Sequence, residues 1–331
     1  MARKMAIAEL MRIPAADHDL VWLKESLQAA VTLEFATLPP YLSAFWSVKN
    51  IGDPVARSIR TVVREEMLHM ALMCNLLAAI GAIPRLNAKD TLPRYPGPLP
   101  GGVNPKLEVA LEGLSGTSVK VFMDVELPED GPVALARGEI YPTIGAFYTA
   151  IQEAFDTLVP ALSPDCQLEG PLGLNKLRTP AEVQQAIHLI KQQGEGSASS
   201  PEDTGPGDLA HYYRFGEIYH QKRLQKNEST GKWEFTGQDM PLPECWPMAR
   251  VPLDGYQQSE VEAGVWKAVI EFDQAFSIML GQLQLAWETT SQDALLSAIE
   301  GMLDMRTLAV ALMQMPIPSR PGNYGPCFRL I

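Results

Sequence analysis

A glutamate and a histidine three residues apart, Glu66 and His69, are the residues of this chain best placed to do chemistry. They lie in the segment 59–80, where apolar residues recur every three or four positions, as they do along one face of an α-helix. The same face runs through Glu66 and His69, so both side chains are expected to point inward. A buried, ionised carboxylate needs an opposite charge or a metal beside it. Carboxylate-bridged di-metal helix bundles use an inward-facing Glu-x-x-His unit, although a core histidine hydrogen-bonded to a glutamate would give the same pattern.

A second carboxylate, Glu34, stands on the apolar face of the preceding helix. That helix is expected to run from about residue 17 into the forties, and Leu20, Leu27 and Glu34 follow one another at seven-residue intervals. A lone glutamate in a leucine stripe more often lies in water at the edge of the face. Its position one helix before the Glu-x-x-His unit favours a role as a metal ligand instead.

Two further glutamates come from later segments. Glu153 lies beside, rather than on, the apolar face of a helix expected over residues 143–158. Glu195 stands between two glycines, just after a helix that opens at Thr179 and Pro180, and the backbone there is free to take an unusual conformation. Spacing alone leaves both assignments open.

The next helix, which Asp208 is expected to cap, offers two competing histidines. His211 shares a face with apolar residues near the start of the helix. Glu217 and His220 form a second Glu-x-x-His unit further along. Because Lys222 follows that unit closely, Glu217 and His220 could equally be a solvated pair.

The elements that must position these residues are mostly helices with recognisable ends. Asp53 and Pro54 supply a cap and a first-turn proline for the second helix, and Gly81 supplies its C-terminal stop. Pro39 and Pro40 should kink or restart the first helix.

The remainder of the chain alternates between irregular and helical patterns. Residues 84–141 are rich in proline, and the alternating apolar residues at 119–125 predict a short strand there. Two long helices are expected at about residues 258–289 and 291–315, with their methionines as core filler. The tail, residues 316–331, is expected to pack as an extended cover.

The composition of the 331-residue chain argues against several classes of protein. A net charge of −12 disfavours nucleic acid or an anionic membrane as the main partner. Four widely spaced cysteines include no Cys-x-x-Cys, so neither a zinc ribbon nor a disulfide framework is expected. No run reaches the roughly 18 apolar residues of a membrane span, and no signal peptide opens the chain. A cytoplasmic location is therefore the expectation. No phosphate-binding glycine loop or Gly-x-Ser-x-Gly elbow occurs.

Five segments resemble, in the same order, one branch of the ferritin-like superfamily: LEFATLPPYLSAFWSV, REEMLHMALMCNLLAAIGAIPRL, IGAFYTAIQEAF, QQGEG and AHYYRFGEIY. This branch includes the ferritin-like domain of the violacein and rebeccamycin imine-dimer synthases and many stand-alone bacterial proteins. The terminal MPIPSRPGNYGPCFRLI resembles the end of that domain, so the match covers nearly the whole chain. Because the chain is far shorter than those synthases, it corresponds at most to their catalytic domain.

The resemblance implies an all-α fold, a ferritin-like four-helix bundle with irregular insertions and two additional C-terminal helices. A single domain is expected over residues 1–331. Its helical metal-binding core would span about residues 17–225, and the C-terminal helices and tail would span about residues 226–331.

The resemblance also implies a metal centre with the ligands Glu34, Glu66, His69, Glu153, Glu195 and His211. It thus prefers Glu195 and His211 to Glu217 and His220, although only the latter pair keeps the three-residue spacing. Four carboxylates and two imidazoles form a hard oxygen and nitrogen set that suits iron, as a di-nuclear centre, or manganese. Glu66 is the natural bridging ligand. A haem is less favoured and would be non-covalent, because no Cys-x-x-Cys-His is present.

These inferences lead to the hypothesis of a metal-dependent oxidoreductase that uses dioxygen or peroxide on a small organic substrate in a secondary-metabolite pathway. No catalytic residue beyond the metal ligands is indicated. Three rival functions are a ferritin-type iron-storage protein, a non-covalent haem oxidase, and a metal-free pathway scaffold. Long irregular insertions suit a closed pocket better than a storage cage, and retention of Glu34 with the Glu-x-x-His unit argues against a scaffold. A homo-oligomer is compatible with the sequence, which does not decide the oligomeric state.

Overall fold

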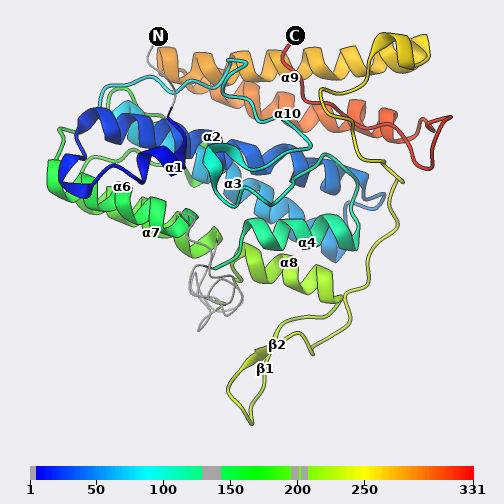
Figure 1. Cartoon of the computed structure of the whole chain (residues 1–331), viewed down its shortest axis with the longest axis horizontal. Coiled ribbons are helices and arrows are strands. Elements are labelled where there is room, and N and C mark those ends of the chain that lie inside the picture. Colours follow the sequence, from blue (N-terminus) through cyan, green and yellow to red (C-terminus); the bar gives the residue numbers. More distant parts are fainter. Residues whose placement is uncertain (1–4, 129–142, 195–200, 203–207) are drawn as a thin grey trace.

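Two long antiparallel helices, α2 (Leu20–Ser47) and α3 (Pro54–Ala79), lie at the centre of the molecule (Figure 1). Their extensive mutual contact follows from the apolar faces described above, because each helix buries that face against the other. The structure is a computed structural model, and it describes residues 5–128, 143–194, 201–202 and 208–331.

Shorter helices cover one side of the central pair, and a two-helix layer covers the other (Figure 1). On the first side α4 packs against α8 and α6 packs against α7; on the second, α9 packs against α10, which contacts α2. These six helices are α4 (Gly116–Val125), α6 (Ile144–Leu158), α7 (Pro180–Gly194), α8 (His211–His220), α9 (Ala263–Thr289) and α10 (Gln292–Met313). The expected all-α fold with two additional C-terminal helices is confirmed.

Minor elements complete the described part of the chain. A short helix, α1 (Ile7–Leu10), precedes α2, and strands β1 (Gln225–Lys226) and β2 (Trp233–Glu234) form a small antiparallel hairpin after α8. Among the described residues, no helix combines the length and hydropathy needed to cross a bilayer. All four cysteines are free thiols, as expected.

The ends of α3 follow the predicted capping residues. The Asp53 carboxylate accepts a hydrogen bond from the Val55 backbone N–H at 2.8 Å, and Pro54 occupies the first helical position. Gly81 follows the helix with a φ of +75°, a conformation that glycine adopts without strain. The cap and stop predicted from the sequence are therefore confirmed.

Of the kink or restart expected at Pro39 and Pro40, the restart is wrong, because α2 continues through both prolines. Pro40 has no N–H to give to the carbonyl of Ala36, one helical turn earlier. The hydroxyl of Tyr95 donates a hydrogen bond to that carbonyl at 2.6 Å instead. Ser43 satisfies the Pro39 carbonyl in the same region at 2.8 Å. A residue from the proline-rich segment thus compensates for the missing helical bond.

The predicted strand at residues 119–125 is also wrong, because this segment forms α4. Ser115 caps the helix and accepts a hydrogen bond from the Ser118 backbone N–H at 3.1 Å. Val119 and Phe122 are buried and lie on one face at helical spacing. The apolar residues at every second position, which suggested a strand, belong to two neighbouring apolar stripes along one helix.

Helix α8 begins later than expected. Ala210, rather than Asp208, occupies the N-cap position, and the Asp208 carboxylate pairs with Arg214 one turn into the helix. The helix ends at His220, because Gln221 takes a left-handed conformation with φ of +54°. His211 is consequently the first residue of the helix.

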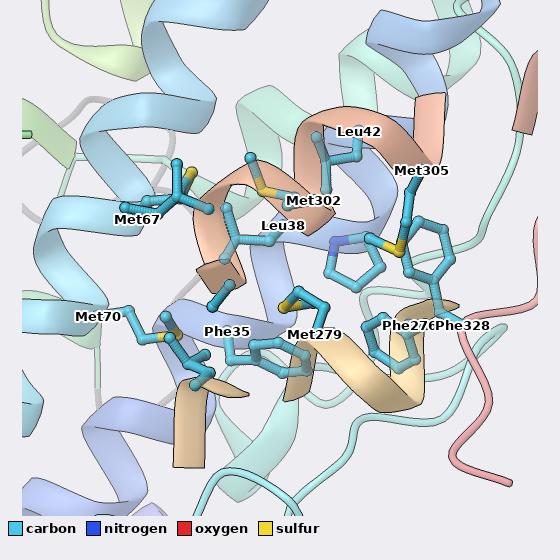
Figure 2. Close-up of a pocket in the computed structure, with 14 residues that line it drawn as sticks. Phe35, Leu38, Leu42, Met67, Met70, Phe276, Met279, Met302, Met305 and Phe328 are labelled. Atoms are coloured by element: carbon cyan, nitrogen blue, oxygen red, sulfur yellow. The ribbon is translucent and has the colours of Figure 1, made fainter. Parts of the chain in front are cut away.

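An apolar cavity of about 40 Å³ lies between the α9–α10 layer and helices α2 and α3. Figure 2 shows Met67 and Met70 of α3 on one side and Met279, Met302 and Met305 of the outer layer on the other. All five are buried or nearly so, which confirms the interpretation of the C-terminal methionines as core residues.

Candidate metal centre

Helices α2 and α3 also bring Glu34, Glu66 and His69 together. All three side chains are buried. His69 Nδ1 lies 3.7 Å from Glu34 Oε2 and 3.7 Å from Glu66 Oε1. The seven-residue stripe on α2 and the Glu-x-x-His unit on α3 therefore meet as the sequence predicted.

Helices α4 and α8 add a second cluster that shares Glu66 with the first. His211 Nδ1 lies 2.8 Å from Glu66 Oε1 and 3.7 Å from Glu126 Oε2. Glu126 follows the last residue of α4 and is buried, as is His211. In each cluster of two glutamates and one histidine, the candidate donor atoms all lie within 4.8 Å of one another.

Hydroxyl groups hold the three carboxylates. Tyr148 of α6 donates a hydrogen bond to Glu34, and Tyr41 of α2 donates one to Glu126 at 2.5 Å. Thr37 donates to the shared Glu66 at 2.7 Å. Each carboxylate thus has one hydroxyl donor, which restricts its rotation and leaves further oxygen lone pairs available.

The two imidazoles are oriented alike. His69 Nε2 lies 2.9 Å from Gln193 Oε1, and His211 Nε2 lies 3.0 Å from Glu65 Oε2. Since both acceptors take an N–H from Nε2, the Nδ1 atom of each ring is left as a lone pair that faces the carboxylates.

Burial and mutual repulsion perturb the ionisation of these groups. Burial raises the pKa of Glu66 to about 7, with repulsion from Glu126 and Glu34 adding to it. Burial lowers the pKa of His69, but the nearby carboxylates of Glu34 and Glu66 outweigh that effect and raise it overall. The pKa of His211 is raised well above its usual value in the same way, against burial, by its neighbouring carboxylates.

The residues fit a bound metal pair. Within the described part of the chain, no lysine or arginine forms an ion pair with the three carboxylates, whose nearest basic partners are the two histidines. Also within that part, His211 Nδ1 makes no hydrogen bond despite its approach to Glu66. Bound divalent cations would explain both features. They would neutralise the buried carboxylates, and they would accept the lone pair of His211 Nδ1. The oxygen and nitrogen donors suit iron or manganese.

The other two predicted ligands have different outcomes. Glu153 is exposed on the outer face of α6, so the structure does not bring it to the cluster, and α6 contributes Tyr148 instead. Glu195 lies outside the described residues and stays a prediction. Gly194, the last described residue before it, lines the pocket beside the carboxylates.

The alternative pair, Glu217 and His220, does not join the cluster. Glu217 pairs with Arg223 at 2.6 Å and accepts a hydrogen bond from the Leu224 backbone N–H at 2.9 Å. His220 is exposed and stacks on Phe235 with ring centroids 4.4 Å apart. The three-residue spacing is kept, but neither side chain reaches the metal-binding face.

Sequence reasoning missed Glu126, Glu65 and Gln193. Glu126 carried a usable signal, because it follows Val119 and Phe122 at helical spacing and so is a carboxylate in an apolar stripe, like Glu34. The strand interpretation of this segment hid that pattern. Glu65 and Gln193 carry no comparable signal, since a polar residue beside a buried face is ordinary.

A small pocket of about 30 Å³ adjoins the carboxylates. It is lined by the cluster residues, by apolar side chains from α2, α4, α6, α7 and the loop before α4, and by the half-buried Lys191. The Lys191 ammonium donates a hydrogen bond to Thr149 at 2.6 Å. The lining residues include Leu33, Leu99, Val125, Ile144, Tyr148 and Ile190.

Comparison with known proteins relates the chain to ferritin-like proteins. A family model described as Ferritin-like matches residues 27–220. Dichlorochromopyrrolate synthase of Lentzea aerocolonigenes is 27% identical over 93% of this chain, which spans only 36% of the length of that protein. The crystal structure of a ferritin-like protein from Caulobacter vibrioides superposes with a TM-score of 0.66 at 19% identity, covering 95% of this chain and 99% of that one.

Proposed function

Because the chain belongs to the ferritin-like family, we propose that it is a metal-dependent oxidoreductase with a di-nuclear centre, iron in the first place and manganese in the second. The observation that carries the proposal is the pair of buried clusters that share Glu66. A shared carboxylate between two sets of ligands is the arrangement that bridges two metal ions in helix bundles.

The substrate is proposed to be a small organic molecule of secondary metabolism. The support is the name of one relative, a dichlorochromopyrrolate synthase. The relative is a much longer protein, so its own substrate is not carried over to this chain. The ammonium of Lys191 on the pocket wall would attract a negatively charged group on such a substrate.

The protein's own residues set the conditions for the reaction. The bound metal pair would supply activation of dioxygen or peroxide. Tyr41, Tyr148 and Thr37 hold the carboxylates in place, and the acceptors on both Nε2 atoms hold the imidazoles. Burial of every donor excludes bulk water and strengthens the electrostatic attraction between ligands and cations.

Elemental analysis of protein purified from its native host, together with its optical spectrum, tests the proposal. We expect about two metal equivalents per chain, because two donor clusters are present, and no Soret band. A Soret band would indicate haem instead. Iron far beyond two equivalents would indicate storage, and protein free of metal that takes none up on reconstitution would indicate a scaffold.

A further inference from the structure

The two halves of the candidate metal centre are built, within the described residues, from the same types of side chain. Each half has two carboxylates, one of them Glu66, and one histidine with its Nδ1 facing them. The carboxylate that is not shared accepts a tyrosine hydroxyl in both halves, from Tyr148 on Glu34 and from Tyr41 on Glu126. Hydroxyl contacts to the carboxylates therefore do not distinguish the two positions.

The halves differ in what holds Nε2 of the histidine. On His69 the acceptor is the neutral amide oxygen of Gln193, at 2.9 Å. On His211 it is the carboxylate of Glu65, at 3.0 Å. Arg214 lies 3.8 Å from the other Glu65 oxygen and is itself paired with Asp208, which fixes the direction of that carboxylate.

A carboxylate acceptor makes an imidazole a stronger ligand than an amide does. It attracts the Nε2 proton, so that electron density shifts toward Nδ1, and it brings a negative charge close to the cation. Loss of such an outer partner typically lowers metal affinity by about 10- to 100-fold. Since the ligands from the described residues are of the same types in the two halves, this difference should appear in the affinities.

We propose that the two metal positions are inequivalent, and that the position formed by Glu66, Glu126 and His211 binds a divalent transition-metal ion more tightly and fills first because Glu65 supports His211. Glu65 and Gln193 are thus positioning residues that set the order of loading. The inference rests on the proposed function, because it requires that both positions bind metal.

Titration of the metal-free protein with Co²⁺ without oxygen, followed by calorimetry and by the visible absorption of bound Co²⁺, tests the proposal. The wild type should show two resolved binding steps. His211→Ala should remove the tighter step, and His69→Ala should remove the weaker one. These two variants assign each step, with its absorption bands, to one half of the centre.

Exchange of the two Nε2 partners then isolates their effect. Glu65→Gln should weaken the tighter step about 10- to 100-fold and leave the weaker step nearly unchanged. Gln193→Glu should strengthen the weaker step by a similar factor. Gln192→Glu is the matched control, since it adds the same charge at the neighbouring position without the hydrogen bond to His69, and it should change neither step by more than about threefold. A ligand that lies outside the described residues is unchanged in all of these variants, so it does not affect the comparison between them.

The possible outcomes separate a failure of the proposed function from a failure of the proposed inequivalence of the two metal positions. Absence of Co²⁺ binding to the folded wild type would overturn the proposed function. Two bound ions with equal affinities, or loss of the tighter step in His69→Ala, would overturn only the inequivalence. The same conclusion would follow if Glu65→Gln, with an unchanged circular dichroism spectrum, kept both wild-type affinities. If that variant does not fold, Gln193→Glu alone decides, because failure to strengthen the weaker step contradicts the proposed role of the partner.

Discussion

At the scale of single residues, Glu66 is the carboxylate that both halves of the candidate metal centre share. It approaches His69 and His211 and has Glu34 and Glu126 on either side. Three carboxylates in one buried space repel one another, and a pair of divalent cations would neutralise that repulsion.

Glu66→Ala should therefore abolish binding at both positions, lowering the metal content from about two equivalents to near zero. The variant should stay folded, because it removes a repelling charge together with its contacts. Glu153→Ala is the matched control, a glutamate exposed on α6, and it should keep the wild-type metal content. Metal analysis of both reconstituted variants makes the comparison; a Glu66→Ala variant that keeps the wild-type metal content would show that Glu66 is no ligand.

The perturbed ionisation of the same residues predicts a pH dependence of metal binding. In the metal-free protein the pKa of Glu66 is about 7 and the pKa values of both histidines are raised, so these groups hold protons at pH 6. Metal binding must displace those protons. Affinity should fall as the pH drops below about 7, by about tenfold per pH unit for each proton released.

Calorimetry in two buffers with different ionisation enthalpies measures this proton release. More protons should be released at pH 6 than at pH 8, since Glu66 is largely ionised at the higher pH. Equal release at both values would mean that Glu66 is already ionised at pH 6.

The sequence predicted part of this residue set for a physical reason. Glu34, Glu66 and His69 interrupt apolar helical stripes, and such an interruption is visible in a periodic pattern. Gln193 and Glu65 act through hydrogen bonds to rings that come from other helices, so their role depends on tertiary contacts that spacing does not encode. Glu153 has the right residue type on the right helix, but it is turned about 100° or more away from the buried face.

At the scale of elements, the starts of α3 and α6 were predictable from local caps, whereas the continuity of α2 was not. Asp53 before α3 and Thr143 before α6 cap locally, so each signal lies within a few residues of the helix it starts. The continuity of α2 through Pro39 and Pro40 depends on Tyr95, more than fifty residues later in the chain. A contact so distant in sequence has no local signature.

Tyr95→Phe should consequently destabilise the protein while leaving its size and packing nearly unchanged. The substitution removes a buried donor and leaves the Ala36 carbonyl without its partner, at a cost of about 1–3 kcal/mol in the free energy of unfolding. Tyr219→Phe, at an exposed position, serves as the control and should cost about 0.5 kcal/mol or less. Urea unfolding measures both; a Tyr95→Phe variant as stable as the wild type would show that the prolines need no outside donor.

At the scale of the whole molecule, the C-terminal tail fastens the α9–α10 layer to the rest. Tyr324 and Phe328 of the tail are buried, and Phe328 packs against Phe276 of α9 and Trp46 of α2. The expected extended cover is therefore a structural part of the core. Phe328 of the tail also lines the apolar cavity of Figure 2.

One buried ion pair joins the tail to α9 and gives a test of that role. The Arg329 guanidinium donates to Asp273 at 2.7 Å, and the Arg329 backbone N–H donates to the same carboxylate at 3.1 Å. Asp273 is fully buried. Burial raises its pKa, and Arg329 acts in the opposite direction without cancelling the rise.

Arg329→Met should cost about 3 kcal/mol in the free energy of unfolding at pH 7, because it leaves a buried carboxylate without its cation. Without the cation, the pKa of Asp273 in the folded state should rise further above its unfolded value. A carboxyl group of this kind favours folding when protonated and loses that contribution as the pH rises through its folded pKa, so the deficit of the variant should shrink at pH 5.

The double variant Asp273→Leu/Arg329→Met removes both charges and should recover most of the loss. Thermal unfolding of the three proteins at both pH values makes the measurement. A deficit that is the same at pH 5 and pH 7, and that the double variant does not repair, would mean that Arg329 stabilises the tail through packing of its side chain on Trp266, 5.4 Å from the ring centre, rather than through its charge.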